Sequence, residues 1–280
     1  RRQRQMCIRD SNIDCEAVEA AITDRTKAVI AVHLFGQCAH MGKLISISKK
    51  HDIHLIEDAA QALMSIYCDE NGISGKAGNI GTIGTTSFFP SKNLGCFGDG
   101  GAIICANHDL VSKCETIANH GSDIKYHHYE VGMNSRLDAI QAAILKVKLK
   151  YLKEYNSARL QAACRYDKLL KDAVGITIPH RDPRSSHVFH QYTIKIDPFC
   201  TDNVQLQKEL QKSGIPTAIY YPTPIHLQPG YNWLDYREGD FPVSEKLSKT
   251  VLSLPMHTEL SAEQQEFIAE SLIAAIKKWI

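Results

Sequence analysis

The sequence lacks long apolar runs and has no excess of charge of either sign. Its longest apolar stretches, such as Ala28 to Leu34, are far shorter than the roughly 20 residues that a helix needs to cross a bilayer. The formal net charge of +1 at pH 7 gives no reason to expect nucleic acid or an anionic membrane as a partner. No segment has the charged start, apolar middle and small-residue cleavage site of a signal peptide. We therefore expect a cytoplasmic protein that binds neither membranes nor nucleic acid.

Cysteine and histidine offer no structural framework either. The nine cysteines are odd in number and scattered, and no two form a Cys-x-x-Cys pair, so neither a disulfide framework nor a structural zinc site is indicated. The histidine pairs, His51 with His54 and His127 with His128, lack a carboxylate or a third ligand at metal spacing. The sequence therefore predicts no metal site.

Residues 1–11 differ from the rest of the chain. Three arginines stand within Arg1–Arg4 without any apolar period, and the run from Met6 to Asp10 resembles a translated sequencing adapter. We expect this segment to be non-native, as a cloning scar would be, with the natural chain beginning further upstream. The alternative is a basic N-terminal arm.

From Asn12 onward, strand-like and helix-like segments alternate. We expect strands at residues 27–34, 54–57, 82–89 and 102–105, and helices at residues 15–22, 40–51 and 110–117. The strand at 27–34 is apolar and β-branched, which is typical of burial on both faces, and Asp14 is placed to cap the first helix. Alternation with short connections predicts an α/β fold, with a mainly parallel sheet and helices on both faces.

Beyond Asn134 the pattern changes. We expect helices at residues 136–170, 204–214 and 262–280, strands at 192–196 and 217–220, and a loop at 175–184. This order indicates a smaller C-terminal α+β domain. The predicted division is a large domain at residues 12–148, followed by a linking helix and the small domain at residues 149–280.

The segment Glu57-Asp58-Ala59-Ala60-Gln61 ends a predicted buried strand. A carboxylate at the carboxyl end of such a strand points into the crevice where α/β sheets bind ligands. Taken alone, Asp58 fits a cap for the next helix equally well.

A lone lysine follows two aromatic residues and a proline in Ser87-Phe88-Phe89-Pro90-Ser91-Lys92-Asn93. Partly dry surroundings disfavour the charged form of a lysine and lower its pKa, which a Schiff-base nucleophile needs. Ser87 can offer its hydroxyl to a phosphate. The glycine-rich run at residues 98–101 is neither a dinucleotide fingerprint nor a Walker A sequence.

A polar step, Asn134-Ser135-Arg136, precedes an apolar helix. Asn134 and Arg136 offer donors suited to phosphate or carboxylate, although the same residues also fit a helix cap.

In this order and spacing, the three segments resemble the DegT/DnrJ/EryC1/StrS family of sugar aminotransferases. The resemblance runs from about Asn12 to the C-terminus and includes Tyr220-Tyr221-Pro222 and His226-Leu227-Gln228-Pro229. It implies the aspartate-aminotransferase-like fold (fold type I), pyridoxal 5'-phosphate (PLP) as cofactor, and a homodimer with shared active sites. Residues 12–148 would then be the remainder of the PLP-binding domain.

The resemblance also implies roles for single residues. Lys92 would be the Schiff-base lysine and proton carrier, and Asp58 would pair with the pyridinium nitrogen of PLP. Gln61 would bond the 3-hydroxyl of the ring and Ser87 the phosphate, while Asn134 would reach the phosphate of the other subunit's cofactor. The candidates for substrate contact are Arg136, Tyr221 and His226.

The chain departs from the family pattern in two places. Family members have a longer N-terminal part with a phosphate-binding turn and an aromatic residue that stacks on PLP, and they carry Arg where Ala118 stands. We therefore expect the chain as given to bind PLP weakly and to show little transamination. A sugar-dehydrating branch of the family has histidine in place of the lysine, so Lys92 favours transamination.

The expected activity is transfer of an amino group, from glutamate or a similar donor, to a nucleotide-diphosphate keto-sugar. The product would feed polysaccharide or glycan-precursor synthesis, and the wording around Lys92 is most similar to members that act on UDP-linked 3-keto sugars, including uronates. One alternative is a non-catalytic relative that keeps the fold for binding or regulation. The presence of Lys92, Asp58 and Gln61 together argues against this alternative. An NAD-dependent sugar enzyme is disfavoured by the missing fingerprint.

Overall fold

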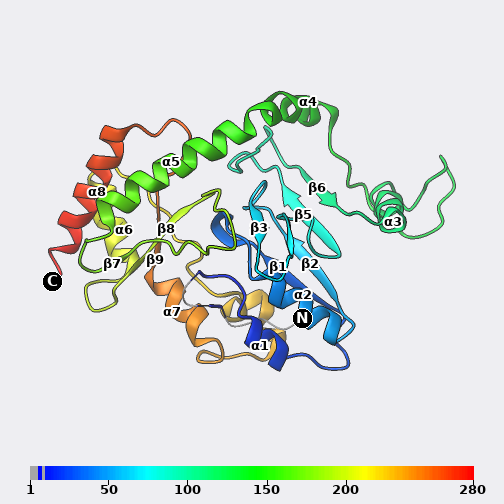
Figure 1. Ribbon diagram of the computed structural model, residues 1–280, viewed down its shortest axis with the longest axis horizontal. Coiled ribbons are helices and arrows are strands. Elements are labelled where there is room, and N and C mark those ends of the chain that lie inside the picture. Colours follow the sequence, from blue (N-terminus) through cyan, green and yellow to red (C-terminus); the bar gives the residue numbers. More distant parts are fainter. Residues whose placement is uncertain (1–5, 8–9) are drawn as a thin grey trace.

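The computed structural model describes residues 6, 7 and 10–280 and shows two groups of elements joined by a long helix (Figure 1). The first group comprises α1 (Cys15–Ala20), β1 (Ala28–Val32), η1 (Leu34–Gly36), α2 (Met41–Lys50), β2 (His54–Asp58), β3 (Ile66–Cys68), β4 (Ser74–Lys76), β5 (Ile83–Ser87), β6 (Gly101–Ile104) and α3 (His108–Ala118). The second comprises α4 (Ala139–Lys148), η2 (Leu149–Tyr151), α5 (Leu152–Leu170), β7 (Ile176–Thr177), β8 (Tyr192–Ile196), α6 (Asn203–Lys212), η3 (Ile225–Leu227), η4 (Pro229–Leu234), α7 (Pro242–Thr250), β9 (Val251–Leu254) and α8 (Ala262–Ile276). Of the predicted non-native segment 1–11, residues 1–5, 8 and 9 lie outside the described residues.

The first group is built on a four-stranded sheet in the order β1-β2-β5-β6. Strands β1, β2 and β5 run parallel, and β6 is antiparallel to β5. One face is covered: Val29 and Leu55 from the strands join Met41 and Leu44 of α2 in one buried cluster. The mixed, mainly parallel sheet with its helices confirms the predicted fold class.

The opposite face of this sheet is open over much of its width. The register places four residues in one row across it: Val32, Asp58, Thr85 and Ile103. Ile30 is 55% exposed and Ile103 53%. The prediction that the strand at 27–34 is buried on both faces is therefore wrong. Its β-branched composition reflects the preference of these residues for extended backbone, which does not require burial on both sides.

The second group closes around its own core. The antiparallel sheet β7-β8-β9 contributes Tyr192 and Leu252, and helices α5 and α8 contribute Tyr166 and Leu272, all fully buried. Helix α5 extends from this core toward the first sheet (Figure 1). The predicted helix at 136–170 is confirmed as α4 and α5, which a single 3-10 turn separates.

Two details of the sequence reading need correction. The predicted strand at 217–220 is not formed, because only Ala218 bridges to Ser253. The partner strand β9 and the hairpin β3–β4 were not predicted, since each is short and depends on pairing with distant residues. The predicted cap is confirmed: Asp14 accepts hydrogen bonds from the backbone N–H groups of Glu16 and Ala17.

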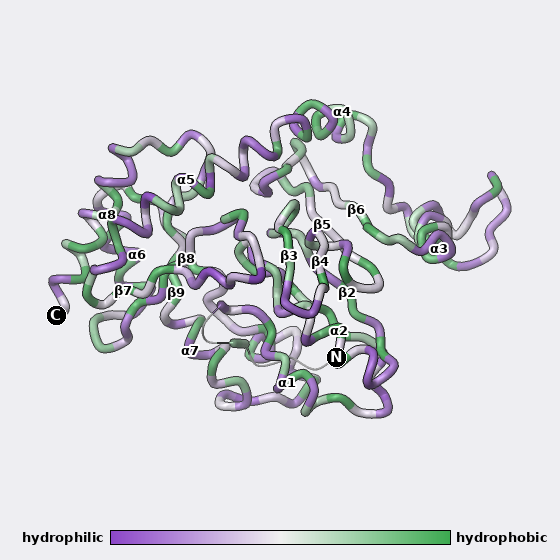
Figure 2. The backbone as a smooth tube through the Cα atoms, viewed as in Figure 1, coloured by the Kyte–Doolittle hydropathy of each residue, from purple (hydrophilic) through white to green (hydrophobic). Residues whose placement is uncertain are grey.

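Residues 119–137 connect α3 to α4 and project away from both cores (Figure 1). Figure 2 shows apolar residues distributed along this segment among hydrophilic ones. Its large exposed apolar side chains are those of Ile124, Tyr126, Tyr129, Val131, Met133 and Leu137. Across the described part of the chain, no helix combines the length and apolar character needed to cross a membrane.

Candidate active site

Three predicted site residues lie at the carboxyl ends of β2 and β5. Asp58 ends β2 and pairs in register with Thr85, and Ser87 follows Thr85 by two residues on the same face. Lys92 lies in the loop that leads from β5 to β6. Because β2 and β5 are parallel, their carboxyl ends meet at one edge, which is where α/β sheets bind ligands. These side chains therefore gather on the open face of the sheet.

The Lys92 loop is tightly folded. The backbone N–H of Lys92 donates to the carbonyl of Phe89 at 2.9 Å, and that of Cys96 to the carbonyl of Phe88 at 2.8 Å. A Cβ atom at Gly95 would lie 2.5 Å from the Pro90 carbonyl oxygen, so only glycine fits this close approach. The loop is thus set by its own backbone bonds.

The Lys92 amine is half-buried and has no ion pair within the described part of the chain. Burial lowers its pKa below the ordinary value, and the negative charge of Asp58 opposes this in part. A lowered pKa leaves more of the amine uncharged, which is the form that attacks a carbonyl carbon.

Asp58 uses only part of its hydrogen-bonding capacity. Its Oδ1 accepts from the backbone N–H of Ala60 at 3.0 Å, in a turn rather than at the start of the helix that the capping alternative requires. Among the described residues, no hydrogen-bond donor reaches Oδ2. One carboxylate oxygen is therefore left for a partner outside the polypeptide.

The residue before Asp58 holds this strand end in place. Glu57 is fully buried and accepts from His33 Nε2 at 2.8 Å and from the backbone N–H groups of Gly78, Ile80 and Gly81. Burial alone would raise the pKa of Glu57, but these hydrogen bonds hold it below the ordinary value. A charged and fully bonded Glu57 thus fixes the end of β2 from its covered face.

The amide of Gln61 has a defined orientation. Its Oε1 accepts from the backbone N–H of Phe35 at 2.6 Å, and its Nε2 lies 3.5 Å from the hydroxyl of Tyr221. A backbone N–H can only donate, so Oε1 must face Phe35 and the NH₂ group must face Tyr221. Sequence reasoning missed Phe35, which has a positive φ of 60° that nothing in the sequence signals.

The other candidates lie elsewhere or are occupied. Asn134 accepts a hydrogen bond from Arg136 Nε at 3.1 Å, and both residues are exposed on the segment 119–137, which projects away from both cores (Figure 1). His226 is buried, and its Nε2 lies 2.9 Å from Glu245. Within one chain, the structure brings Lys92, Asp58, Gln61, Ser87 and Tyr221 to one region and leaves Asn134, Arg136 and His226 outside it.

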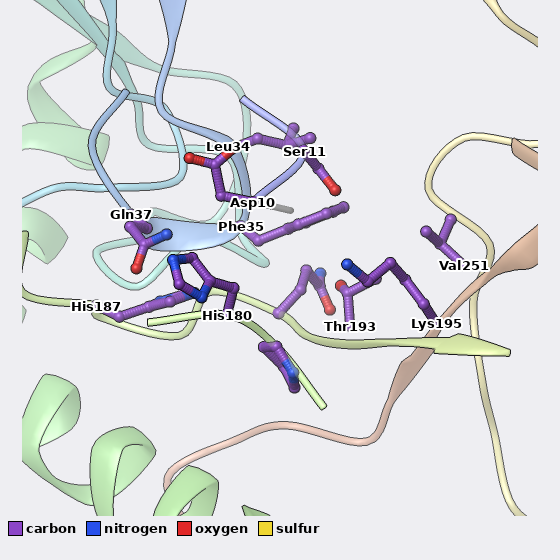
Figure 3. A pocket seen from close by; sticks show the side chains of 12 residues that line it. Asp10, Ser11, Leu34, Phe35, Gln37, His180, His187, Thr193, Lys195 and Val251 are labelled. Atoms are coloured by element: carbon purple, nitrogen blue, oxygen red, sulfur yellow. The ribbon is translucent and has the colours of Figure 1, made fainter. Parts of the chain in front are cut away.

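A separate, small hollow lies between η1 and β8 (Figure 3). Gln37, His187, Thr193 and Lys195 line it together with residues of the flanking loops, and none of the predicted site residues does. It is therefore distinct from the Lys92 region. No group of His, Cys, Asp and Glu among the described residues is arranged to hold a metal ion.

Known proteins share both the sequence and the fold. Residues 6–273 match the DegT/DnrJ/EryC1/StrS aminotransferase family. The chain is 47% identical over 264 residues to a pleiotropic regulatory protein of Geobacillus stearothermophilus, covering 93% of this chain and 68% of that protein. It is 42% identical over 264 residues to UDP-2-acetamido-2-deoxy-3-oxo-D-glucuronate aminotransferase of Pseudomonas aeruginosa, covering 94% and 70%. The crystal structure of DesV from S. venezuelae superposes with a TM-score of 0.89 at 36% identity, covering 99% of this chain and 71% of that one.

Proposed function

Because the chain belongs to the DegT/DnrJ/EryC1/StrS aminotransferase family, we propose that it moves an amino group from an amino acid, glutamate first among the candidates, to a nucleotide-linked keto-sugar. Aminotransferases of this family use PLP. The observation that carries the proposal is the partly dry Lys92 amine beside the Asp58 carboxylate at the open edge of the sheet.

The side chains at this edge fit PLP in kind. The set comprises an amine without an ion pair, a carboxylate with one free oxygen, an amide whose NH₂ group is turned toward the site, and a hydroxyl. These groups match an aldehyde, a ring nitrogen, a ring hydroxyl and a phosphate respectively. When bound, PLP supplies an electron sink for the carbon that loses a proton.

The hydrogen bonds that each residue makes indicate its proposed role. With PLP bound, Lys92 would be the residue that holds its aldehyde group, and its uncharged amine would take up a proton and return it. The free oxygen of Asp58 would keep a proton on the ring nitrogen, and the NH₂ group of Gln61 would donate to the ring hydroxyl. Ser87 Oγ accepts from the Phe89 N–H at 3.2 Å, which leaves its own hydrogen for the phosphate.

The substrate we propose is a UDP-linked 3-keto sugar, with a uronate as the first choice, in polysaccharide or glycan-precursor synthesis. The support is the 42% identity to the UDP-linked 3-oxo-glucuronate aminotransferase, against 37% to a dTDP-3-amino-3,4,6-trideoxy-α-D-glucose transaminase. Tyr221, Arg136 and His226 remain the candidates for sugar contact. Of these, Tyr221 lies at Gln61, within reach of a ligand on the open face.

We propose a homodimer in which Asn134 serves the cofactor of the other subunit. The exposed apolar side chains of residues 119–137 support this, because a patch of this kind marks a protein interface. If it is correct, mixing inactive Lys92→Ala with an Asn134→Ala variant gives hybrid dimers with one native site. The mixture should then be more active than the sum of its parts. The nine unpaired cysteines support a reducing, cytoplasmic location.

A second candidate is a regulatory protein without catalysis, favoured by the name of the relative from Geobacillus stearothermophilus. The presence of Lys92, Asp58 and Gln61 together at the open edge argues against it. A regulatory protein has no need of an amine, a carboxylate and an oriented amide at the same place.

Two half-reactions separate the candidates. The PLP-loaded protein should lose its visible absorbance on addition of glutamate, and a UDP-linked 3-keto sugar should restore it. A dTDP-linked 3-keto sugar serves as the nucleotide control. Bound PLP whose absorbance glutamate leaves unchanged would support the regulatory candidate.

A further inference from the structure

A buried pair of polar side chains lies directly beside Lys92. Asn93 belongs to the Lys92 loop and His190 to the segment before β8, and both are buried. His190 Nδ1 lies 3.2 Å from Asn93 Oδ1. Asn93 Nδ2 donates to the carbonyl of Val188 at 3.0 Å and to Oδ1 of Asn156, on α5, at 2.8 Å. The pair therefore connects the Lys92 loop to both α5 and the entry of β8.

These bonds fix the protonation of the histidine. The Val188 carbonyl can only accept, so the NH₂ group of Asn93 faces it and Oδ1 faces His190. His190 Nδ1 must then carry the hydrogen of this bond. Burial lowers the pKa of His190 to about 3, and the positive charges of Lys92 and Arg159 act in the same direction. The ring is thus neutral and adds no second positive charge beside the Lys92 amine.

The backbone of His190 is held as firmly as its ring. Nη1 of Arg159, on α5, donates to the carbonyls of Phe189 at 3.1 Å, His190 at 3.2 Å and Met256 at 3.2 Å. Arg159 is itself buried. Since backbone and ring are both fixed, His190 can hold the Lys92 loop in one position.

We infer that Asn93 and His190 are positioning residues for Lys92, which hold its loop against α5 and keep water from the amine on that side. That this positioning helps catalysis rests on the proposed function. The positioning itself depends only on contacts within the polypeptide and is present without the cofactor. It places a determinant of the site in the C-terminal group of elements, far along the chain from Lys92.

Competitive amine labelling of the cofactor-free protein across a pH series tests this directly. Mass spectrometry of the Lys92 peptide gives the pH profile of that amine, with the exposed Lys76 as an internal reference. In His190→Ala, water should reach the amine and move the profile to higher pH. Relative to the plateau at high pH, reaction at about pH 8 should fall at least about threefold. His190→Asn, whose amide nitrogen can replace Nδ1 as donor to Asn93, should retain the original profile.

His187→Asn is the matched control. His187 is a partly buried histidine three residues earlier, and it accepts from the Phe189 N–H, while no hydrogen bond joins it to the Lys92 loop among the described residues. An unchanged Lys92 profile in His190→Ala, or an equal shift in His187→Asn, would overturn the inference. Should His190→Ala fail to fold, Asn156→Ala removes one acceptor of Asn93 and should give a smaller shift in the same direction. No shift there would count equally against the inference. If Lys92 does not react with PLP, the proposed function is wrong, but the labelling comparison of the His190 and His187 variants is unaffected.

Discussion

The two groups of elements differ in how completely they bury their sheets. The C-terminal sheet β7-β8-β9 is enclosed, with Tyr192, Ile194, Leu252 and Leu254 all at 2% exposure or less. The N-terminal sheet is covered on one face only and leaves Ile30 more than half exposed on the other. The residues assigned to PLP lie on that open face. The comparison indicates that the enclosed core supplies stability, while Asp58, Ser87 and Lys92, which we propose to hold PLP, lie on the face that this chain leaves open.

The largest effect should come from Lys92→Ala. In a version of the chain extended ahead of Asn12 with the N-terminal part of a relative, turnover and covalent attachment should both be abolished, because among the described residues Lys92 is the amine that lies beside Asp58. The unfolding free energy should stay the same or rise slightly, because the variant removes a charge whose burial is unfavourable. Turnover assays and denaturant unfolding check the two halves. A large loss of stability would mean that the open face also supports the fold.

Asp58→Asn should come next. The amide keeps the size of the side chain and the turn bond to Ala60 but cannot hold a proton on the ring nitrogen. PLP should still bind, while kcat falls by about two orders of magnitude or more. Near-normal turnover would mean that Asp58 only stabilises the local turn and that its carboxylate has no role in catalysis.

A pair of truncations compares the two regions directly. Leu252→Ala empties a fully buried position and should cost about 2–5 kcal/mol of unfolding free energy. Ile30→Ala removes an exposed side chain from the open face and should cost about 1 kcal/mol or less. Denaturant unfolding of both variants under one condition is the measurement. Equal costs would show that the open face is covered in solution.

The last effect is a pH dependence of stability that the C-terminal region should carry. Burial lowers the pKa of His187 and of His190 from the ordinary 6.5 to about 3. Between pH 6.5 and about pH 3, these two histidines therefore bind protons in the unfolded chain but not in the folded protein. Stability is fully present above about pH 6.5 and is lost toward pH 3, by about 1.4 kcal/mol per pH unit for each histidine. His187→Asn should flatten the slope by one histidine's share, and an unchanged slope would assign the loss to other groups.

The sequence predicted the regular elements better than the contacts between them, and the roles of the site residues stay predictions. Helices with a clear apolar period, such as that of α5, and the strand at Tyr192 to Ile196 were found within a few residues. Asp58 and Lys92 could be singled out because their neighbours in sequence are also their neighbours in the site. The features that could not be predicted depend on residues far apart in the sequence. Strand β9 forms by pairing with β8, and the exposure of the sheet face that carries Ile30 depends on which elements pack against it.

The surroundings of the site show the same limit. Phe35 fixes the Gln61 amide through a backbone N–H in a left-handed turn, and His190 reaches Asn93 across 97 positions of sequence. Neither contact has a local pattern that a reader of the sequence could recognise. The local sequence motif therefore identifies the residues proposed to react, and contacts between residues far apart in the sequence orient them.

We propose that Lys92 on the open face is the amine that holds PLP. Borohydride reduction of the PLP-loaded protein, followed by digestion and mass spectrometry, identifies the lysine that is attached to the cofactor. One pyridoxyl-modified peptide is expected, containing Lys92, and none from Lys92→Ala. Modification at Lys76 or Lys113 with Lys92 unmodified would contradict it.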